Sequence, residues 1–262
     1  MRDAGEGRVA AFEVVNEPNL QMWPQRSKSS LTSYPAGPFG VEGSRMTIHL
    51  AVAEMMATMD TIASRYHAGV DLLGPSHSDA DSLRPRQISV HTTTPYSAVD
   101  EPFVEGLLDE LERIGFRAGP RWGWSFHNYN DIELNQLRVV SLRERLDGRW
   151  RGKQVNGGPA LYATEGGVRL SRVRQRFGAT LPIDRVMELQ GEVLREAWSR
   201  HHRSQDPGKG VVMMTQYTVY ADPGFDCAIR DHLGGERPSA VVFNDLQERG
   251  HTSEWPKWLE PA

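Results

Sequence analysis

Short hydrophobic runs alternate with longer amphipathic stretches along the chain. Five runs have the length and the β-branched or aromatic content of strands. They cover residues 9–16, 70–73, 122–126, 160–164 and 211–219. Between them, apolar residues recur every three or four positions, which indicates helices with one buried face. Strands that alternate with helices in this way predict βαβ units and a parallel sheet.

The clearest predicted helices begin at recognisable start signals. Ser44 and Thr180 are placed to cap helices, while Pro102 and Pro182 occupy the first turn, where proline is tolerated. Basic residues at positions 200–203 complement the dipole at the end of one helix. The predicted helices cover residues 45–66, a segment from Pro102, residues 132–147, a segment from Pro182 to the basic cluster, and residues 238–247, where a strand is the alternative.

Polar side chains follow three of the predicted strands directly. The first strand ends in Asn16-Glu17-Pro18, the third in His127-Asn128-Tyr129, and the fourth in Thr164-Glu165-Gly166-Gly167. In α/β barrels the catalytic groups lie at this end of the strands. Two strand-end glutamates supply the pair of carboxyl groups that most glycoside hydrolases use, so the pattern indicates glycoside hydrolysis.

In this order, the Asn-Glu-Pro, His-x-Tyr and Thr-Glu-x-Gly motifs resemble clan A of the glycoside hydrolases. The run from Glu13 to Leu20, followed by Trp23, is most similar to the β-xylosidase and iduronidase family (family 39), with the cellulase family (family 5) next. The resemblance implies an α/β fold, the TIM (β/α)8 barrel. It also implies an acid/base carboxyl after the fourth strand and a nucleophile after the seventh.

The resemblance implies a role for each residue that matches the motifs. Glu17 would be the acid/base and Glu165 the nucleophile of a retaining enzyme that cleaves β-glycosidic O-glycosyl bonds by double displacement, with no metal or cofactor. The implied substrate-binding residues are Asn16, beside the reacting carbon, His127, Tyr129, which would hold the nucleophile, Trp23, and Tyr217, for which Tyr220 is the alternative where many members have a tryptophan.

Five strands are too few for a barrel of eight. If Glu17 follows strand four, the chain is expected to hold strands four to eight in residues 1–250, with a tail at 251–262, and to lack the first three βα units. A truncated gene, a partner polypeptide and a rebuilt smaller fold would each account for this. An open sheet predicts self-association through its exposed edges. The alternative function is a non-catalytic, carbohydrate-binding remnant of such a barrel.

Composition narrows the remaining classes. A net charge of −4 and a hydrophobic content of 39% indicate neither a nucleic-acid partner nor a membrane protein. The first residues lack the apolar segment of a secretion signal, although the location of the protein stays open. At 262 residues, length alone would allow a whole barrel of about 250.

Several residues are predicted to serve structure rather than chemistry. We expect Cys227 to be an inert side chain. Trp122 and Trp124, on one side of their strand, are expected to pack in the barrel wall or against helices rather than to stack on sugar. A segment with His77, Asp79 and Asp81 lacks regular metal-ligand spacing and is predicted to be a solvated loop. Gly166-Gly167 lacks the glycine spacing of a phosphate loop.

Overall fold

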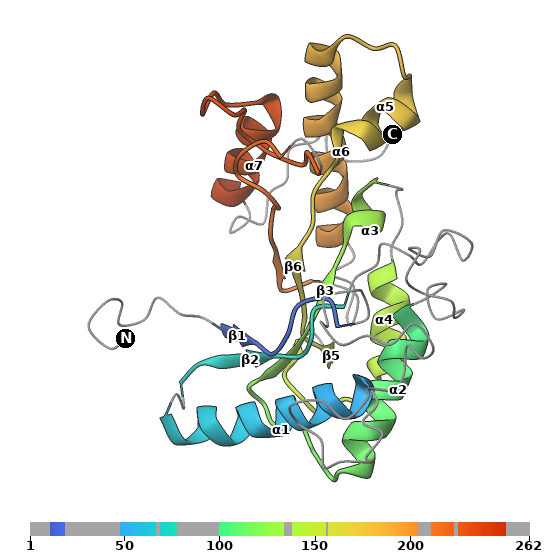
Figure 1. Cartoon of the computed structure of the whole chain (residues 1–262), viewed down its shortest axis with the longest axis vertical. Helices are drawn as coiled ribbons and strands as arrows, with labels where there is room; N and C mark the ends of the chain where they lie inside the picture. The colour runs from blue at the N-terminus through green and yellow to red at the C-terminus, as the bar shows by residue number, and fades with distance from the viewer. Residues whose placement is uncertain are drawn as a thin grey trace, which may run out of the picture. The chain divides into compact units, whose positions relative to one another are not determined.

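The computed structural model describes residues 11–18, 48–66, 69–77, 100–133, 138–155, 157–203, 211–222 and 225–249. The chain divides into two compact units, drawn in Figure 1. The first unit comprises Met1–His127 and Ser141–Tyr162, and the second comprises Asn128–Val140 and Ala163–Ala262. Trp23, Ser44, Asp79, Asp81 and the predicted tail lie outside the described residues.

Three parallel strands form the sheet of the first unit: β1 (Ala11–Glu13), β2 (Asp71–Leu73) and β3 (Trp122–His127). Phe12 lies opposite Leu72, which lies opposite Trp122. Isolated bridges from Asn16 to Ser76 and from His77 to Phe126 continue this pairing beyond the strand ends. Because the strands are parallel, the residues that follow β1, β2 and β3 lie along one edge of the sheet.

Helices α1 (Ile48–Tyr66) and α2 (Asp100–Arg113) pack on each other in the first unit. Helix α4 (Arg138–Leu146) and the antiparallel pair β4 (Gln154–Val155) and β5 (Gly158–Pro159) follow β3. Among the apolar residues of α1, Ala53 and Met56 are fully buried, whereas Ile62 is 50% exposed and lines a groove together with Val14.

The core of the first unit is built around the tryptophans of β3. Trp122 and Trp124 are fully buried, and their rings meet Phe116 and Trp150 edge to face at 5.6 and 5.1 Å between centroids. The indole Nε1–H of Trp122 donates to Asp60 on α1 at 2.7 Å. The prediction that these two tryptophans pack in the wall is therefore confirmed.

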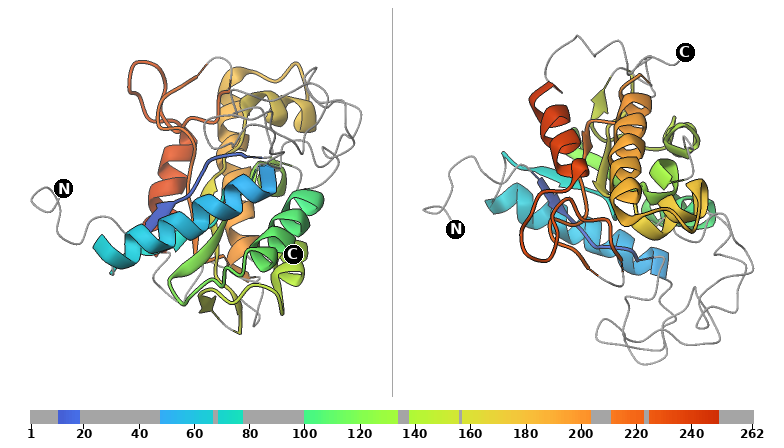
Figure 2. Two further views of the ribbon diagram at one scale, coloured as in Figure 1. Left: turned by 60° about the horizontal axis from the view of Figure 1, so that its bottom comes forward. Right: turned by 90° about the horizontal axis from the view of Figure 1, so that it is seen from above.

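The second unit contains α3 (Tyr129–Glu133), α5 (Leu170–Phe177), α6 (Ile183–Arg203), β7 (Met213–Met214) and α7 (Pro238–Arg249). Strand β6 (Leu161–Glu165) enters it from the first unit, and the strand order of the sheet is β1-β2-β3-β6-β7. Figure 2 shows α6 and α7 running alongside each other.

Helix α6 forms the centre of the core in the second unit. Gln190 on α6 is buried, donates from Nε2 to the Val168 carbonyl at 2.7 Å and accepts from Ser239 of α7 at 3.2 Å. The surrounding cluster is apolar and consists of Ile132, Val168, Leu170, Val173, Val186, Leu189, Val193, Leu194, Ala197, Val242 and Leu246. This packing confirms that the repeat from Pro182 onward forms a helix with one buried face.

Three expectations differ from the structure. Residues 211–219 form only the short β7, because the segment is largely exposed and its backbone bonds are scattered, as from Tyr217 N–H to the Gly166 carbonyl at 2.7 Å. The helix predicted at 132–147 is divided into α3 and α4. Helix α5 is not predicted, because only Leu170 and Val173 give it a buried face among several arginines. The two alternatives predicted for residues 238–247 are decided in favour of the helix, which is α7.

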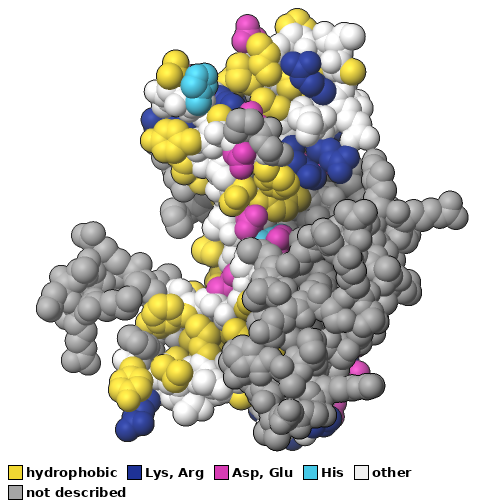
Figure 3. Space-filling model, viewed as in Figure 1, with side chains coloured by type: hydrophobic (Ala, Val, Ile, Leu, Met, Phe, Trp, Pro, Cys, Tyr) yellow, Lys and Arg dark blue, Asp and Glu magenta, His cyan; other side chains and the backbone are white. Residues whose placement is uncertain are grey.

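An apolar groove of about 390 Å³ lies between β1 and α1. Hydrophobic side chains gather over this region in the space-filling view (Figure 3), and Ile62 and Tyr66 of α1 are among the exposed ones. Among the helices of the described ranges, none combines the length and hydropathy needed to cross a membrane.

Candidate active site

Glu17 follows β1 and has an unusual backbone conformation. Its φ of 45° lies in the left-handed region, which residues other than glycine seldom adopt. The Glu17 N–H donates to the Ser76 carbonyl at 2.7 Å, and the Ser76 N–H donates to the Val15 carbonyl at 3.2 Å. Backbone strain of this kind persists only where the surroundings hold it, and it is concentrated at functional sites.

The carboxylate of Glu17 meets the last residue of β3. Nδ1 of His127 lies 2.8 Å from Oε1 of Glu17, and the side chains are 1% and 17% exposed. The backbone N–H of His127 donates to the His77 carbonyl at 3.0 Å, which fixes the strand end. Both groups of this pair can gain or lose a proton, and the tautomer of His127 decides which atom donates.

Ser76 was not identified from the sequence, although it contacts two polar residues of the first strand. Its hydroxyl lies 2.6 Å from Oε1 of Glu13 and 2.9 Å from Oδ1 of Asn16. A hydroxyl carries one proton, so it donates to one of these oxygens at a time. Ser76 follows the Gly74-Pro75 turn after β2, the position equivalent to that of Asn16 after β1, and this was the available signal.

Glu165 ends β6 and accepts a short hydrogen bond from Tyr129. The distance from Tyr129 Oη to Glu165 Oε1 is 2.6 Å, and Tyr129 is 4% exposed at the start of α3. Burial and the adjacent Glu165 raise the pKa of Tyr129 far above its ordinary value. Tyr129 therefore remains a protonated donor at any ordinary pH, and a hydrogen bond from such a donor is stronger to an ionised than to a neutral acceptor.

A buried ion pair lies behind Tyr129. Glu133 on α3, whose side chain is fully buried, accepts from Arg169 at Nε (2.7 Å), Nη2 (2.5 Å) and the backbone N–H (3.0 Å). The guanidinium of Arg169 lies over the rings of Phe225 and Tyr129, at 4.8 and 6.0 Å from their centroids. No motif pairs Glu133 with Arg169, so sequence reasoning missed both residues.

Tyr217 is the candidate tyrosine that reaches this group. Its ring is 38% exposed and meets Tyr129 and Phe225 edge to face, at 6.4 and 5.9 Å between centroids. Tyr220 lies elsewhere, is 59% exposed and forms a bridge with Arg230. Of these two tyrosines, Tyr217 is therefore the one that packs on Tyr129.

The glycines after Glu165 allow two close approaches. A Cβ at Gly166 would lie 1.8 Å from Oδ1 of the fully buried Asn128. A Cβ at Gly167 would lie 2.6 Å from the carbonyl oxygen of Tyr217. The Gly-Gly pair thus lets the segments around it approach the end of β6, and this steric role explains its presence without a phosphate ligand.

The predicted site residues fall into two groups. In the first unit, His127 contacts Glu17, and Ser76 contacts Asn16. In the second unit, Tyr129 contacts Glu165, and Tyr217 packs on Tyr129. Only Asn128 separates His127 from Tyr129 in the chain. The remaining predicted site residue, Trp23, lies outside the described part of the protein.

Two residues outside these groups, Cys227 and His77, can be compared with their predicted roles. Burial raises the pKa of the Cys227 thiol, in agreement with the expectation of an inert side chain. The prediction of a solvated loop is wrong for His77, which is 2% exposed because its backbone extends the pairing of β2 toward β3. The His77 ring packs on Phe103 and Trp124 instead.

Comparison with solved structures identifies the fold. A monomeric β-xylosidase from Caulobacter crescentus CB15 matches with a TM-score of 0.50 and 14% identity, covering 90% of this chain and 41% of that chain. Xylanase 10B from Thermotoga maritima matches at 0.43 and 15%, covering 94% and 62%. GH5_18 from Bifidobacterium longum subsp. longum matches at 0.40 and 14%, covering 80% and 54%.

The likeness to the β-xylosidase, which among these three structures reaches a TM-score of 0.50, confirms the predicted resemblance at the level of fold. The chain has part of a (β/α)8-barrel fold of this glycosidase type, and it spans about two fifths of the length of the β-xylosidase. A scan against protein-family models finds no match for the chain, and neither does a search of curated proteins.

Proposed function

We propose that this chain carries the catalytic residues of a retaining glycoside hydrolase that cleaves β-glycosidic O-glycosyl bonds. One observation carries the proposal: the two strand-end glutamates are held by side chains two positions apart, Glu17 by His127 and Glu165 by Tyr129. The Cα atoms of residues i and i+2 are never more than about 7 Å apart, since a chain advances at most about 3.6 Å per residue. The two carboxylates therefore contact side chains of one short segment, residues 127–129.

Glu17 is the acid/base in this proposal. In the first step its proton passes to the glycosidic oxygen, which leaves with the electron pair of the bond to the anomeric carbon. In the second step the same carboxylate takes a proton from the attacking water. Such a carboxyl group must change its protonation state twice per turnover. A histidine partner suits this task, because its ring can donate a hydrogen bond to the carboxylate or accept one from the carboxylic acid.

Glu165 is the nucleophile. Its carboxylate oxygen attacks the anomeric carbon as the leaving group departs, and the resulting glycosyl ester is cleaved when water attacks the same carbon and releases Glu165 as a carboxylate. The phenol of Tyr129 supports this role, because it is a fixed donor that matches an ionised acceptor. Its raised pKa keeps it from becoming a competing anion.

Asn16, His127 and Tyr217 are proposed to bind the carbohydrate. The side chain of Asn16 is exposed after β1, so its amide is accessible to a sugar hydroxyl next to the reacting carbon. Tyr217 offers a partly exposed ring against which the apolar face of a sugar can pack. The β-xylosidase match favours a β-xyloside as the first substrate to test.

The stereochemical outcome tests the proposal directly. Hydrolysis of aryl β-xylosides and β-glucosides, followed by proton NMR, is expected to release the β-anomer first. A crystal structure is expected to place the carboxyl groups of Glu17 and Glu165 about 5 to 5.5 Å apart, the separation typical of retaining enzymes. Release of the α-anomer with a separation of about 6.5 to 9.5 Å would indicate an inverting enzyme. Carboxyl groups that face different directions would exclude both mechanisms.

A second candidate is a carbohydrate-binding module without turnover. It is favoured by exposed groups that can contact a sugar without any chemistry, the side chain of Asn16 and the ring of Tyr217. Calorimetric titration with xylo-oligosaccharides separates the candidates when combined with the turnover assay. Binding without any product supports the module, whereas product formation supports the enzyme.

A further inference from the structure

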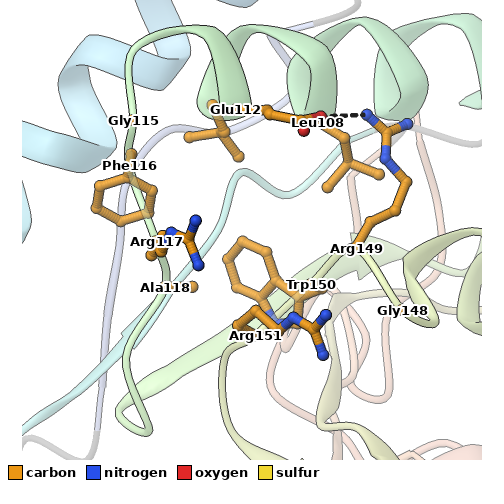
Figure 4. Close-up of a pocket in the computed structure, with 11 residues that line it drawn as sticks. Leu108, Glu112, Gly115, Phe116, Arg117, Ala118, Gly148, Arg149, Trp150 and Arg151 are labelled. Atoms are coloured by element: carbon orange, nitrogen blue, oxygen red, sulfur yellow. Dashed lines mark ion pairs between the residues drawn. The ribbon is translucent and has the colours of Figure 1, made fainter.

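A second cavity lies in the first unit at the end of β3 opposite to His127. It has a volume of about 270 Å³ and opens between the end of α2, the loop at residues 115–118 and the loop at residues 148–151 (Figure 4). Six strand residues separate the two ends by roughly 17 Å, at about 3.3 Å per residue. None of the predicted site residues lines this cavity.

Part of the cavity lining is apolar and well supported, and charged side chains, those of Glu112 and three arginines, form much of the rest. Leu108 and Leu111 of α2 are buried there, and Phe116 closes one side. Trp150 is 4% exposed and is packed edge to face on Trp124, so its position is set by the core of the unit. A wall of this kind is formed before any ligand arrives, which lowers the entropic cost of binding.

Three arginines line the same cavity, and their charges are not equally compensated. The charge of Arg149 is compensated, because its guanidinium donates to Glu105 and Asp109 at 2.6 Å each and lies 3.9 Å from Glu112. Arg117 and Arg151 are exposed, and neither is paired with a carboxylate in the part of the chain that the structure describes. Figure 4 shows their side chains flanking the indole of Trp150.

We propose that this cavity binds a small, single-ring molecule that carries one carboxylate or phosphate group. The guanidinium groups of Arg117 and Arg151 match such an anion in geometry and charge. The apolar wall formed by Phe116 and Trp150 suits the ring. The volume lies just below the range of about 300 to 1,000 Å³ of drug-sized pockets, which limits the ligand to one ring. The inference does not depend on the proposed glycosidase activity.

Calorimetric titration of the full chain with phenyl phosphate, benzoate and benzyl alcohol tests this site. The two anions are expected to bind at least tenfold more tightly than the neutral alcohol, and their order distinguishes a phosphate from a carboxylate preference. Inorganic phosphate is expected to bind more weakly than phenyl phosphate, because it gains nothing from the apolar wall. Equal binding of the alcohol and the anions would overturn the role of the arginines, and equal binding of both phosphates would overturn that of the ring.

Two variants locate the binding. The double substitution Arg117→Gln with Arg151→Gln is expected to lower the affinity for phenyl phosphate at least tenfold. Arg65→Gln is the matched control, because Arg65 is exposed on α1 and does not line the cavity. Circular dichroism melting verifies that both proteins fold. Unchanged affinity in the folded double variant, or an equal loss in the control, would show that the anion binds elsewhere and would refute the proposal.

Amide chemical shifts give an independent measure of position. On addition of phenyl phosphate, the largest changes are expected at residues 115–118 and 148–151, the two loops that border the cavity. Changes confined to residues around Glu17 or Glu165 would assign the ligand to the candidate active site instead and would contradict a separate site.

Discussion

The two candidate catalytic glutamates differ in how they are held. Glu17 lies on a left-handed backbone position and contacts a titratable histidine. Glu165 ends a regular strand and contacts a tyrosine whose pKa is raised by burial. The difference matches the two chemical tasks that we propose for these residues. A group that exchanges protons benefits from a partner that can also change its charge, whereas a group that must stay ionised benefits from a donor that cannot.

The contacts that hold His127 and Tyr129 in place also differ. The backbone of His127 is paired with residue 77, whereas Tyr129 lies against Arg169, which Glu133 holds through a buried ion pair. Backbone pairing survives most side-chain substitutions, but a buried ion pair does not survive the loss of one member. The Glu165 side is therefore expected to be more sensitive to substitution at a distance.

Removing each carboxylate gives the largest expected effect and tests the two roles against each other. Glu165→Gln is expected to lower kcat by roughly 10³-fold or more for every substrate, because no nucleophile remains. Glu17→Gln is expected to lower kcat strongly for phenyl β-glycosides but much less for dinitrophenyl β-glycosides, whose leaving groups need little protonation. The measurement is kcat for both leaving groups, with Glu188→Gln on the exposed surface of α6 as the control. A reversed dependence on the leaving group would exchange the two assignments.

Truncation of Glu133 tests the buried support of Tyr129. Glu133→Ala leaves the charge of Arg169 without its partner, and the free energy of unfolding is expected to fall by about 3 to 5 kcal/mol. Urea unfolding followed by fluorescence measures this loss. Glu192→Ala, which removes an exposed partner of Arg185, is expected to cost less than about 1 kcal/mol. Similar losses of unfolding free energy in both variants would show that the buried ion pair stabilises the fold no more than the exposed pair does.

Tyr129→Phe tests the fixed donor on the Glu165 side. A hydrogen bond to a charged group contributes about 1.5 to 3 kcal/mol, so kcat/KM is expected to fall by roughly 10- to 150-fold. The shape of the pH–rate profile is expected to stay the same, because Tyr129 does not titrate in the working range. Tyr220→Phe, which removes an exposed hydroxyl, is the matched control.

His127→Gln is the counterpart on the Glu17 side. It replaces a titratable partner with a neutral one, so it is expected to change the shape of the pH–rate profile as well as its height. If Tyr129→Phe changed the shape while His127→Gln changed only the height, the contrast between the two sides would be refuted.

The smallest effect concerns a histidine outside both groups. Burial lowers the pKa of His49 from 6.5, so the folded state favours the neutral ring. The stability that this provides is present above the unfolded pKa of about 6.5 and is lost as the pH falls toward the lower folded value. The free energy of unfolding is expected to fall less steeply below pH 6.5 in His49→Gln than in the natural chain. His232→Gln, at an exposed position, is the control variant in the same measurement.

Much of the fold followed from local patterns. Helices α1 and α6 and strands β1 and β2 lie within predicted segments, and α2, β3 and β6 extend beyond theirs by one or two residues. The agreement is close because helical and strand periodicity are properties of consecutive residues. Segment 211–219 was overestimated, since its hydrophobic residues are exposed and no local signal distinguishes a buried run from an exposed one. Helix α5 was missed for the converse reason, because its buried face consists of two residues.

The sequence by itself determined which polar residues follow each strand, and it determined the spacing that attaches the anchors of both glutamates to one strand end. Only the tertiary structure decided that the Ser76 hydroxyl contacts Asn16, that Arg169 pairs with Glu133, and that the backbone of Glu17 has a left-handed conformation. The physical reason is range. Periodicity and turn chemistry act between neighbouring residues, whereas ion pairs, burial and strained dihedrals depend on segments that are remote in the chain and meet only after folding.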